Sequence, residues 1–141
     1  MESPKAILET TIYAGDIDAA EAFYRDVLGL DVVAKLDGKF VFLRCGQQML
    51  LVFNPVESAR AGDGNPIPRH GACGSGHVCF RAADVAEVNR WRDRFRSFGV
   101  VIEHEHVWEK TGGHSVYIRD PAGNSVEVAE GRIWGFDQAA G

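Results

Sequence analysis

The chain carries the same pattern of elements twice, and this internal repeat constrains its fold more than any other feature. The segments IYAGDIDAAEAFYRD (residues 12–26) and FRAADVAEVNRWRDR (residues 80–94) each read as a strand end, an aspartate and an amphipathic helix. The two aspartates, Asp16 and Asp84, lie 68 positions apart, and each can cap the helix that follows it. The repeat therefore predicts two similar modules.

Three strand-like segments follow each predicted helix. They cover residues 30–36, 39–46 and 47–54 in the first half, and 100–108, 114–121 and 124–130 in the second half. The predicted fold class is α+β, with two tandem βαβββ modules that form a cupped mixed β-sheet around a cavity. We expect one domain over residues 1–141, with a first module at 6–54, a Gly/Pro-rich linker loop at 55–75, a second module at 76–130 and a C-terminal tail at 131–141.

Composition and charge exclude several classes of protein. The net charge is -5 and the basic residues do not cluster, which argues against a nucleic-acid partner. No apolar run approaches the roughly 20 residues of a membrane span, and the first ten residues lack the apolar core of a signal peptide. The three cysteines show no CxxC spacing, so neither a disulfide framework nor a structural zinc site is predicted. We expect a cytoplasmic protein without a membrane partner.

Strand alternation assigns polar side chains to the cavity face. In the strand that starts at residue 77, the apolar alternate positions are expected to face the helix, which leaves His77 facing the cavity. The same reasoning places Glu9 and Glu127 on cavity faces of their strands. The repeat makes Glu9 equivalent to His77, at an offset of 68, and Leu51 equivalent to Glu127, at an offset of 76. Three of the four equivalent cavity positions therefore carry metal-ligand side chains.

This donor set favours a divalent metal ion. One imidazole (His77) and two carboxylates (Glu9 and Glu127) suit Fe(II), Mn(II), Ni(II), Co(II) or Zn(II), and they leave coordination positions for water and substrate. The alternative is a metal-free pocket in which the three groups hydrogen-bond one another or a ligand. Both interpretations stay open at this point.

Other side chains are candidates for catalysis or for binding a small-molecule substrate. Glu127 and His114 are candidate proton-transfer groups, with His114 expected at the cavity mouth. His70 is either a lid residue over the cavity or an exposed loop residue. His104 and His106 lie on a strand that we interpret as an edge with a solvated face. The candidate pocket wall consists of Tyr13, Phe42, Leu51, Phe53, Trp108 and Tyr117, each of which could instead be ordinary core.

Three segments resemble the vicinal oxygen chelate superfamily, also called the glyoxalase / bleomycin resistance / extradiol dioxygenase group. They are AEAFYRDVLGL at 20–30 after Asp16, GHVCF at 76–80 and RDPAGNSVEV at 119–128. The resemblance covers about residues 6–130. It implies paired βαβββ modules, a metal at the centre of the cupped sheet and a homodimer, and it maps the family's metal positions onto Glu9, Leu51, His77 and Glu127.

The resemblance implies a metal-dependent enzyme of the lyase or isomerase type. Such an enzyme acts on a small oxygen-chelating substrate through a metal-stabilised enolate or alkoxide. This chain departs from two family patterns, because glyoxalase I enzymes carry Glu or Gln where it has Leu51, and Glu9 stands where a histidine is more usual. Two alternatives are a metal-free protein that binds an antibiotic or a metabolite, and an extradiol-type dioxygenase.

Overall fold

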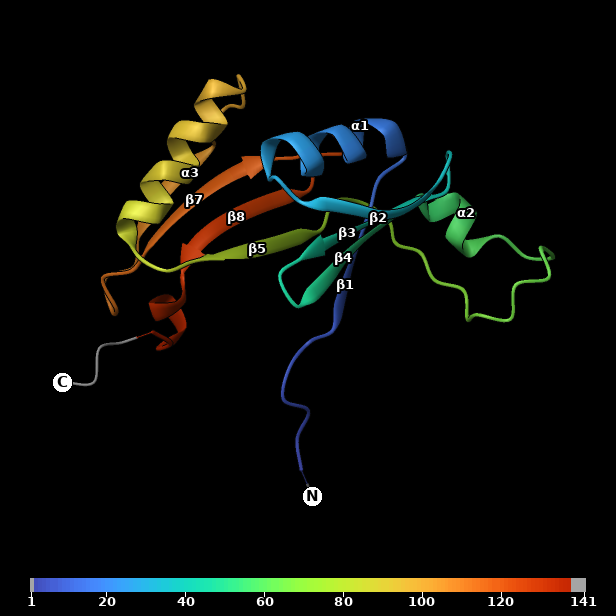
Figure 1. Cartoon of the computed structure of the whole chain (residues 1–141), viewed down its shortest axis with the longest axis horizontal. Helices are drawn as coiled ribbons and strands as arrows, with labels where there is room; N and C mark the ends of the chain where they lie inside the picture. Colours follow the sequence, from blue (N-terminus) through green and yellow to red (C-terminus); the bar gives the residue numbers. More distant parts are fainter. Residues whose placement is uncertain (1, 138–141) are drawn as a thin grey trace. The chain divides into compact units, whose positions relative to one another are not determined.

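The computed structural model describes residues 2–137, in which eight strands form two four-stranded mixed sheets (Figure 1). The chain divides into two compact units after Gly76, and each unit contains one sheet. In both units the order along the chain is strand, helix, strand, strand, strand. The predicted α+β class and the repeated βαβββ order are therefore confirmed.

The first unit holds strands β1 to β4. Its elements are β1 (Glu9–Tyr13), α1 (Ile17–Ala22), a π-helical turn (Phe23–Val27), β2 (Asp31–Leu36), β3 (Phe40–Cys45) and β4 (Gln48–Phe53). The sheet order is β1-β4-β3-β2, with β1 parallel to β4 and the other pairs antiparallel.

Helix α1 covers one face of the first sheet. Asp16 caps it as predicted, because its carboxylate accepts a hydrogen bond from the Ala19 N–H at 3.0 Å. The helix packs on β3 and β4, where Val41 and Leu43 are fully buried. Side chains alternate along a strand, so the other face of this sheet carries Glu9 and its alternate neighbours.

The linker differs from the predicted loop because it begins with a short helix, α2 (Pro55–Ala59). Asn54 caps this helix by accepting the Val56 N–H at 3.0 Å, and Pro55 suits its first turn. The Ser58 hydroxyl donates to the carbonyl of His70 at 2.7 Å. The far end of the linker is thereby tied back to α2.

The second unit repeats the order with a longer helix. Its elements are β5 (His77–Ala82), α3 (Val85–Ser97), β6 (His104–Val107), β7 (His114–Arg119), β8 (Ser125–Glu130) and a 3-10 turn (Gly131–Trp134). The sheet order is β5-β8-β7-β6, with β5 parallel to β8. Among the described residues, no helix is long and apolar enough to cross a membrane.

Two side-chain caps start α3. The Asp84 carboxylate accepts the Glu87 N–H at 2.8 Å, and the Glu87 carboxylate accepts the Ala83 N–H at 2.6 Å. The helix packs on β5, β7 and β8 and buries Phe95. Figure 1 shows α3 on one face of this sheet, so the candidate site residues of the opposite face are not covered by it.

Candidate active site

The candidate site of the second unit centres on Glu127, in the middle of β8. Its residue neighbours in register are Cys79 on β5 and Tyr117 on β7, while His77 on β5 pairs with Ser125. Because side chains alternate, these residues share the sheet face opposite α3, as the sequence predicts for His77 and Glu127. The flanking β8 residues on the helix side are fully buried valines, which fixes this register.

His77 is held on both sides. Its Nδ1 lies 3.0 Å from the Ser125 hydroxyl and 3.2 Å from the Ser125 carbonyl oxygen, and its Nε2 lies 3.2 Å from the Glu127 Oε2. Two proton arrangements satisfy these contacts. In one, Nε2–H donates to Glu127 and Nδ1 accepts from the hydroxyl. In the other, Nδ1–H donates to Ser125, and the Nε2 lone pair faces the carboxylate across a position suited to a cation.

The second oxygen of Glu127 is unusual. Its side chain is only 7% exposed, and within residues 2–137 the Oε1 atom is buried with no hydrogen-bond partner. A buried polar atom left in this way costs about 1–3 kcal/mol. One carboxylate oxygen thus faces an imidazole nitrogen while the other is free to bind a ligand, which is a donor pair that fits a divalent cation.

Two neutral groups flank this carboxylate. Burial, followed by the negative charge of Glu127, raises the pKa of the Cys79 thiol to about 12. Burial and the same charge raise the pKa of Tyr117 to about 12. Both groups therefore stay protonated at neutral pH, so that Cys79 is not a reactive thiolate and Tyr117 can donate a hydrogen bond.

An aromatic row extends from His77 toward the edge of the sheet. The Tyr117 ring stacks against His77 at 6.4 Å between centroids and approaches His104 at 6.1 Å. Farther along, His106 meets Trp108 edge-on at 4.6 Å. The sequence predicts β6 as an edge strand and Tyr117 and Trp108 as wall residues. It does not predict that His104 and His106 join them, although the β6–β7 register carries that information.

The predicted wall residues of the first unit also gather on one face. Phe53 pairs with Tyr13 across β1 and β4, and Phe42 pairs with Leu51 across β3 and β4. The Phe42 and Phe53 rings meet edge-on at 5.3 Å. Glu9 lies on β1 on this same face and is solvent-exposed in this unit. Leu51 is buried, with 8% exposure.

His70 is docked on this aromatic face. Its Nδ1 lies 2.7 Å from the Tyr13 hydroxyl, and its ring meets Phe53 edge-on at 4.5 Å between centroids. A linker residue without any periodic pattern is therefore anchored by a specific hydrogen bond. His70 is exposed in the linker, as one of its two predicted positions has it, and the contact with Tyr13 adds to that prediction.

His114 lies away from Glu127. Along β7 it shares the side of Val116 and Ile118, which are buried beneath α3, and its partner is the buried Glu130 of β8. The structure thus brings His77 and Glu127 together and leaves His114 on the opposite face of the second sheet. Among the described residues, no cluster of three His, Cys, Asp or Glu side chains is placed to hold a metal. Glu9 stays a predicted third ligand.

Comparison with known proteins agrees with this architecture. The family model "Glyoxalase/Bleomycin resistance protein/Dioxygenase superfamily" matches residues 6–128. A lactoylglutathione lyase from Agrobacterium tumefaciens, known from its crystal structure, is 61% identical, with 96% of this chain and all 100% of that chain covered and a TM-score of 0.93.

More distant structures share the fold alone. A glyoxalase/bleomycin resistance protein/dioxygenase from Nocardioides is 16% identical with a TM-score of 0.71, over 92% of this chain and 85% of that one. A virulence protein from Salmonella typhimurium is 23% identical with a TM-score of 0.68, over 92% of this chain and 98% of that one. A comparison with curated protein sequences gives no match.

Proposed function

Because the chain belongs to the Glyoxalase/Bleomycin resistance protein/Dioxygenase superfamily, we propose that it is a divalent-metal-dependent enzyme of the lyase or isomerase type. Its substrate is a small organic molecule with two neighbouring oxygen atoms. The 61% identity with a lactoylglutathione lyase makes a glutathione thiohemiacetal, with lactoylglutathione as product, the first substrate to test. A fold of this kind supports many activities, so the proposal rests on the site.

The observation that carries the proposal is the buried Glu127 carboxylate. Its Oε2 faces the Nε2 of His77 at 3.2 Å, and its Oε1 is buried without a partner among residues 2–137. A cation accepted by both groups would offset the cost of that buried oxygen. The Ser125 carbonyl and hydroxyl contact the other ring nitrogen and can fix the tautomer that presents Nε2 to a metal.

The proposed division of roles follows from these positions. His77 and Glu127 hold the metal, with Glu9 as the third ligand that the repeat predicts. When bound, the metal supplies Lewis-acid stabilisation of negative charge that develops on a substrate oxygen. Glu127 can also take and return a substrate proton, and the neutral Tyr117 hydroxyl can orient the substrate by donating a hydrogen bond. Leu51 supplies no fourth ligand, which leaves room for substrate oxygens.

A metal-free binding protein is the second candidate. The observation that favours it is the 3.2 Å distance between the His77 Nε2 and the Glu127 Oε2, which a direct Nε2–H hydrogen bond satisfies without a cation. The aromatic face with Tyr13, Phe53 and His70 could then bind a ligand by stacking. Ligand binding that is unchanged by a chelator and survives Glu127→Gln would favour this function.

The decisive experiment measures metal binding and turnover on the same sample. Protein stripped with EDTA is titrated calorimetrically with Mn²⁺, Co²⁺, Ni²⁺ and Zn²⁺, and then assayed with the thiohemiacetal of glutathione and methylglyoxal. We expect about one metal per chain, activity only with metal, and at least about 100-fold weaker metal binding in Glu127→Gln.

The matched control is Glu103→Gln, which changes an exposed carboxylate that pairs with Arg119 in the same unit. It should leave metal affinity unchanged. Absence of metal binding to the wild-type protein would refute the proposal, whereas metal binding without turnover of this substrate would refute only the glutathione assignment. A homodimer is expected from the family, and light scattering after size-exclusion chromatography tests it.

A further inference from the structure

The second unit contains a cavity on the side of its sheet that faces α3. Its volume is about 360 Å³, and its lining includes Val85, Val88, Asn89 and Arg92 of α3 together with Glu105 and His114 of the sheet. This volume lies at the lower end of the range for small-molecule sites. His114 contributes to the lining and is 35% exposed at its side chain, so it is accessible from the cavity.

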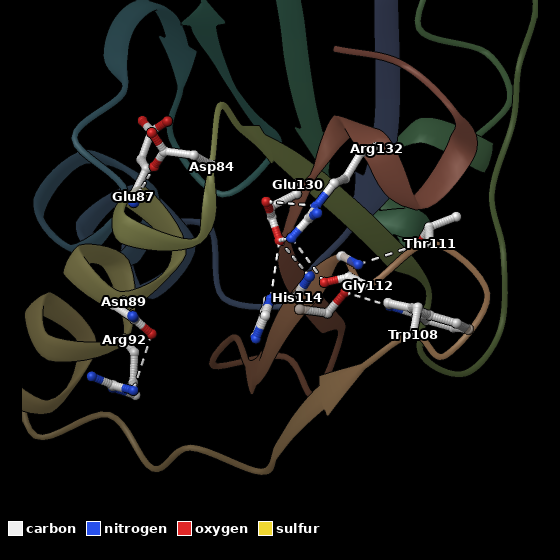
Figure 2. Close-up of polar contacts among 12 residues, drawn as sticks. Asp84, Glu87, Asn89, Arg92, Trp108, Thr111, Gly112, His114, Glu130 and Arg132 are labelled. Carbon is white, nitrogen blue, oxygen red and sulfur yellow. Dashed lines mark hydrogen bonds and ion pairs between the residues drawn. The ribbon is translucent and has the colours of Figure 1, made fainter. Parts of the chain in front are cut away.

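A buried carboxylate fixes the orientation of His114 (Figure 2). Glu130, with a side chain only 4% exposed, accepts the His114 backbone N–H at 2.6 Å, and its Oε2 lies 3.1 Å from the ring Nδ1. Arg132 donates from Nε to the other Glu130 oxygen at 3.0 Å and from Nη2 to the Gly112 carbonyl at 2.9 Å. A framework of this kind holds the imidazole in one position.

The network also assigns the tautomer of His114. Burial alone would raise the pKa of Glu130, but the His114 N–H, the Arg132 guanidinium and the imidazole together lower it. The ionised carboxylate only accepts hydrogen bonds, so Nδ1 carries a proton, and in the neutral imidazole Nε2 keeps its lone pair. Among residues 2–137, Nε2 has no hydrogen-bond partner, and it is the polar atom that His114 can offer to a ligand.

The α3 side of the cavity supplies donors and little net charge. The Arg92 Nη1 donates to the Asn89 Oδ1 at 3.2 Å and to the Glu105 Oε1 at 3.3 Å, and its Nε donates to Asp93 at 3.1 Å. Two carboxylates therefore balance the guanidinium, which makes an anion a poor match. The Asn89 amide NH₂ is left to donate, while Val85 and Val88 provide apolar surface.

We infer that this cavity is a second small-molecule site, separate from the Glu127 face, for a small apolar molecule that carries one hydroxyl group, as a phenol does. The hydroxyl donates to the His114 Nε2 and accepts from the Asn89 amide. The ring or short carbon body of the ligand packs against the valines of α3. A buried carboxylate behind the imidazole strengthens it as an acceptor for a weakly acidic hydroxyl.

The test uses isotope-labelled full-length protein and two probes that differ in one hydrogen-bond donor. Phenol is titrated into the protein and followed by amide and imidazole chemical shifts, and anisole serves as the donor-free probe of similar shape. We expect phenol to bind with millimolar affinity and shift residues 85–92 and His114, and anisole to bind at least about tenfold more weakly.

Variants separate this site from the candidate active site. His114→Gln and Asn89→Leu should each weaken phenol binding about tenfold, and Glu127→Gln should leave it unchanged. Two variants are used so that poor folding of one, visible in its spectrum, leaves the other as the test. The inference is overturned if phenol shifts map to β5 and β8 around Glu127, if anisole binds as well as phenol, or if both cavity variants bind phenol normally.

Discussion

Replacing Glu127 by methionine should stabilise the metal-free protein. The Glu127 side chain is 7% exposed and its Oε1 is buried without a partner in the described part of the chain, a situation that costs about 1–3 kcal/mol. Methionine has a similar length and no charged atom, so the substitution removes this cost. It also removes the contact with His77, whose side chain is 48% exposed and can bind water instead, at a loss of about 0.5 kcal/mol.

The balance predicts a gain of about 1 kcal/mol in the free energy of unfolding, which corresponds to a rise in Tm of about 3 °C. Urea denaturation in EDTA measures the free energy. In saturating Mn²⁺ or Ni²⁺ the order should reverse, because a metal at 100 times its Kd stabilises the wild-type protein by about 2.7 kcal/mol and the variant has lost a ligand.

Glu130→Met is the matched control, because Glu130 is equally buried on the same strand. Its carboxylate accepts hydrogen bonds from His114 and Arg132, so its loss leaves a backbone N–H without its acceptor and removes the counter-charge of a half-buried guanidinium that keeps the Gly112 carbonyl. We expect a loss of at least about 2 kcal/mol. A loss of similar size for Glu127→Met would refute the reasoning, since it would mean that Glu127 is satisfied within the fold.

Three further predictions concern other groups of the second unit and its boundary. At pH 8 iodoacetamide should label Cys73 much faster than Cys79, although both side chains are exposed, because the thiol pKa of Cys79 is raised to about 12. Mass spectrometry of tryptic peptides measures the ratio, and equal rates would contradict the raised pKa of Cys79. Asp120→Ala should lower the free energy of unfolding, measured by urea denaturation, by about 2–3 kcal/mol. The reason is that the Asp120 carboxylate accepts the N–H groups of Ala122 and Asn124 in the turn before β8. A change below about 0.5 kcal/mol would contradict this role. The pKa of Glu130 is lower in the folded protein than its unfolded value near 4.5, so its ionised carboxylate stabilises the fold fully above that value and less as pH falls through the folded pKa. Glu130→Gln should therefore lose less stability between about pH 5 and pH 3 than the wild type. Parallel stability curves for the two proteins would refute the lowered pKa of Glu130.

Strand periodicity was sufficient to predict which side chains share a face. The buried valines of β8 alternate with Glu127, and the parallel register with β5 brings His77 to the same face. The same alternation predicts the position of His114. It stands two and four residues before Val116 and Ile118 on β7, so it lies on the same side of the sheet as they do, facing α3. His114 therefore does not lie at the predicted cavity mouth, and the structure places it beside Glu130.

Other contacts have no periodic signature in the sequence. The hydrogen bond between Tyr13 and His70 joins residues 57 positions apart, and His70 sits in an irregular linker, so no local pattern predicts it. The short helix α2 is different, because Asn54 followed by Pro55 is a recognisable helix start that the loop composition of the linker obscured. Local sequence patterns therefore predict helix caps and the sheet face of a side chain, whereas the position of a loop residue such as His70 depends on tertiary contacts.

The comparison of Glu127 with Glu130 connects fold to function. The two residues lie three positions apart on β8, so they point to opposite faces, and both are buried. Glu130 is saturated by donors from His114 and Arg132, as expected for a structural group. Glu127 faces the His77 imidazole, the Cys79 thiol and the Tyr117 hydroxyl, and its Oε1 has no hydrogen-bond partner within residues 2–137. Because folded proteins rarely leave buried carboxylate oxygens unpaired, Glu127 is the residue of this pair whose remaining partner is expected to come from outside the chain.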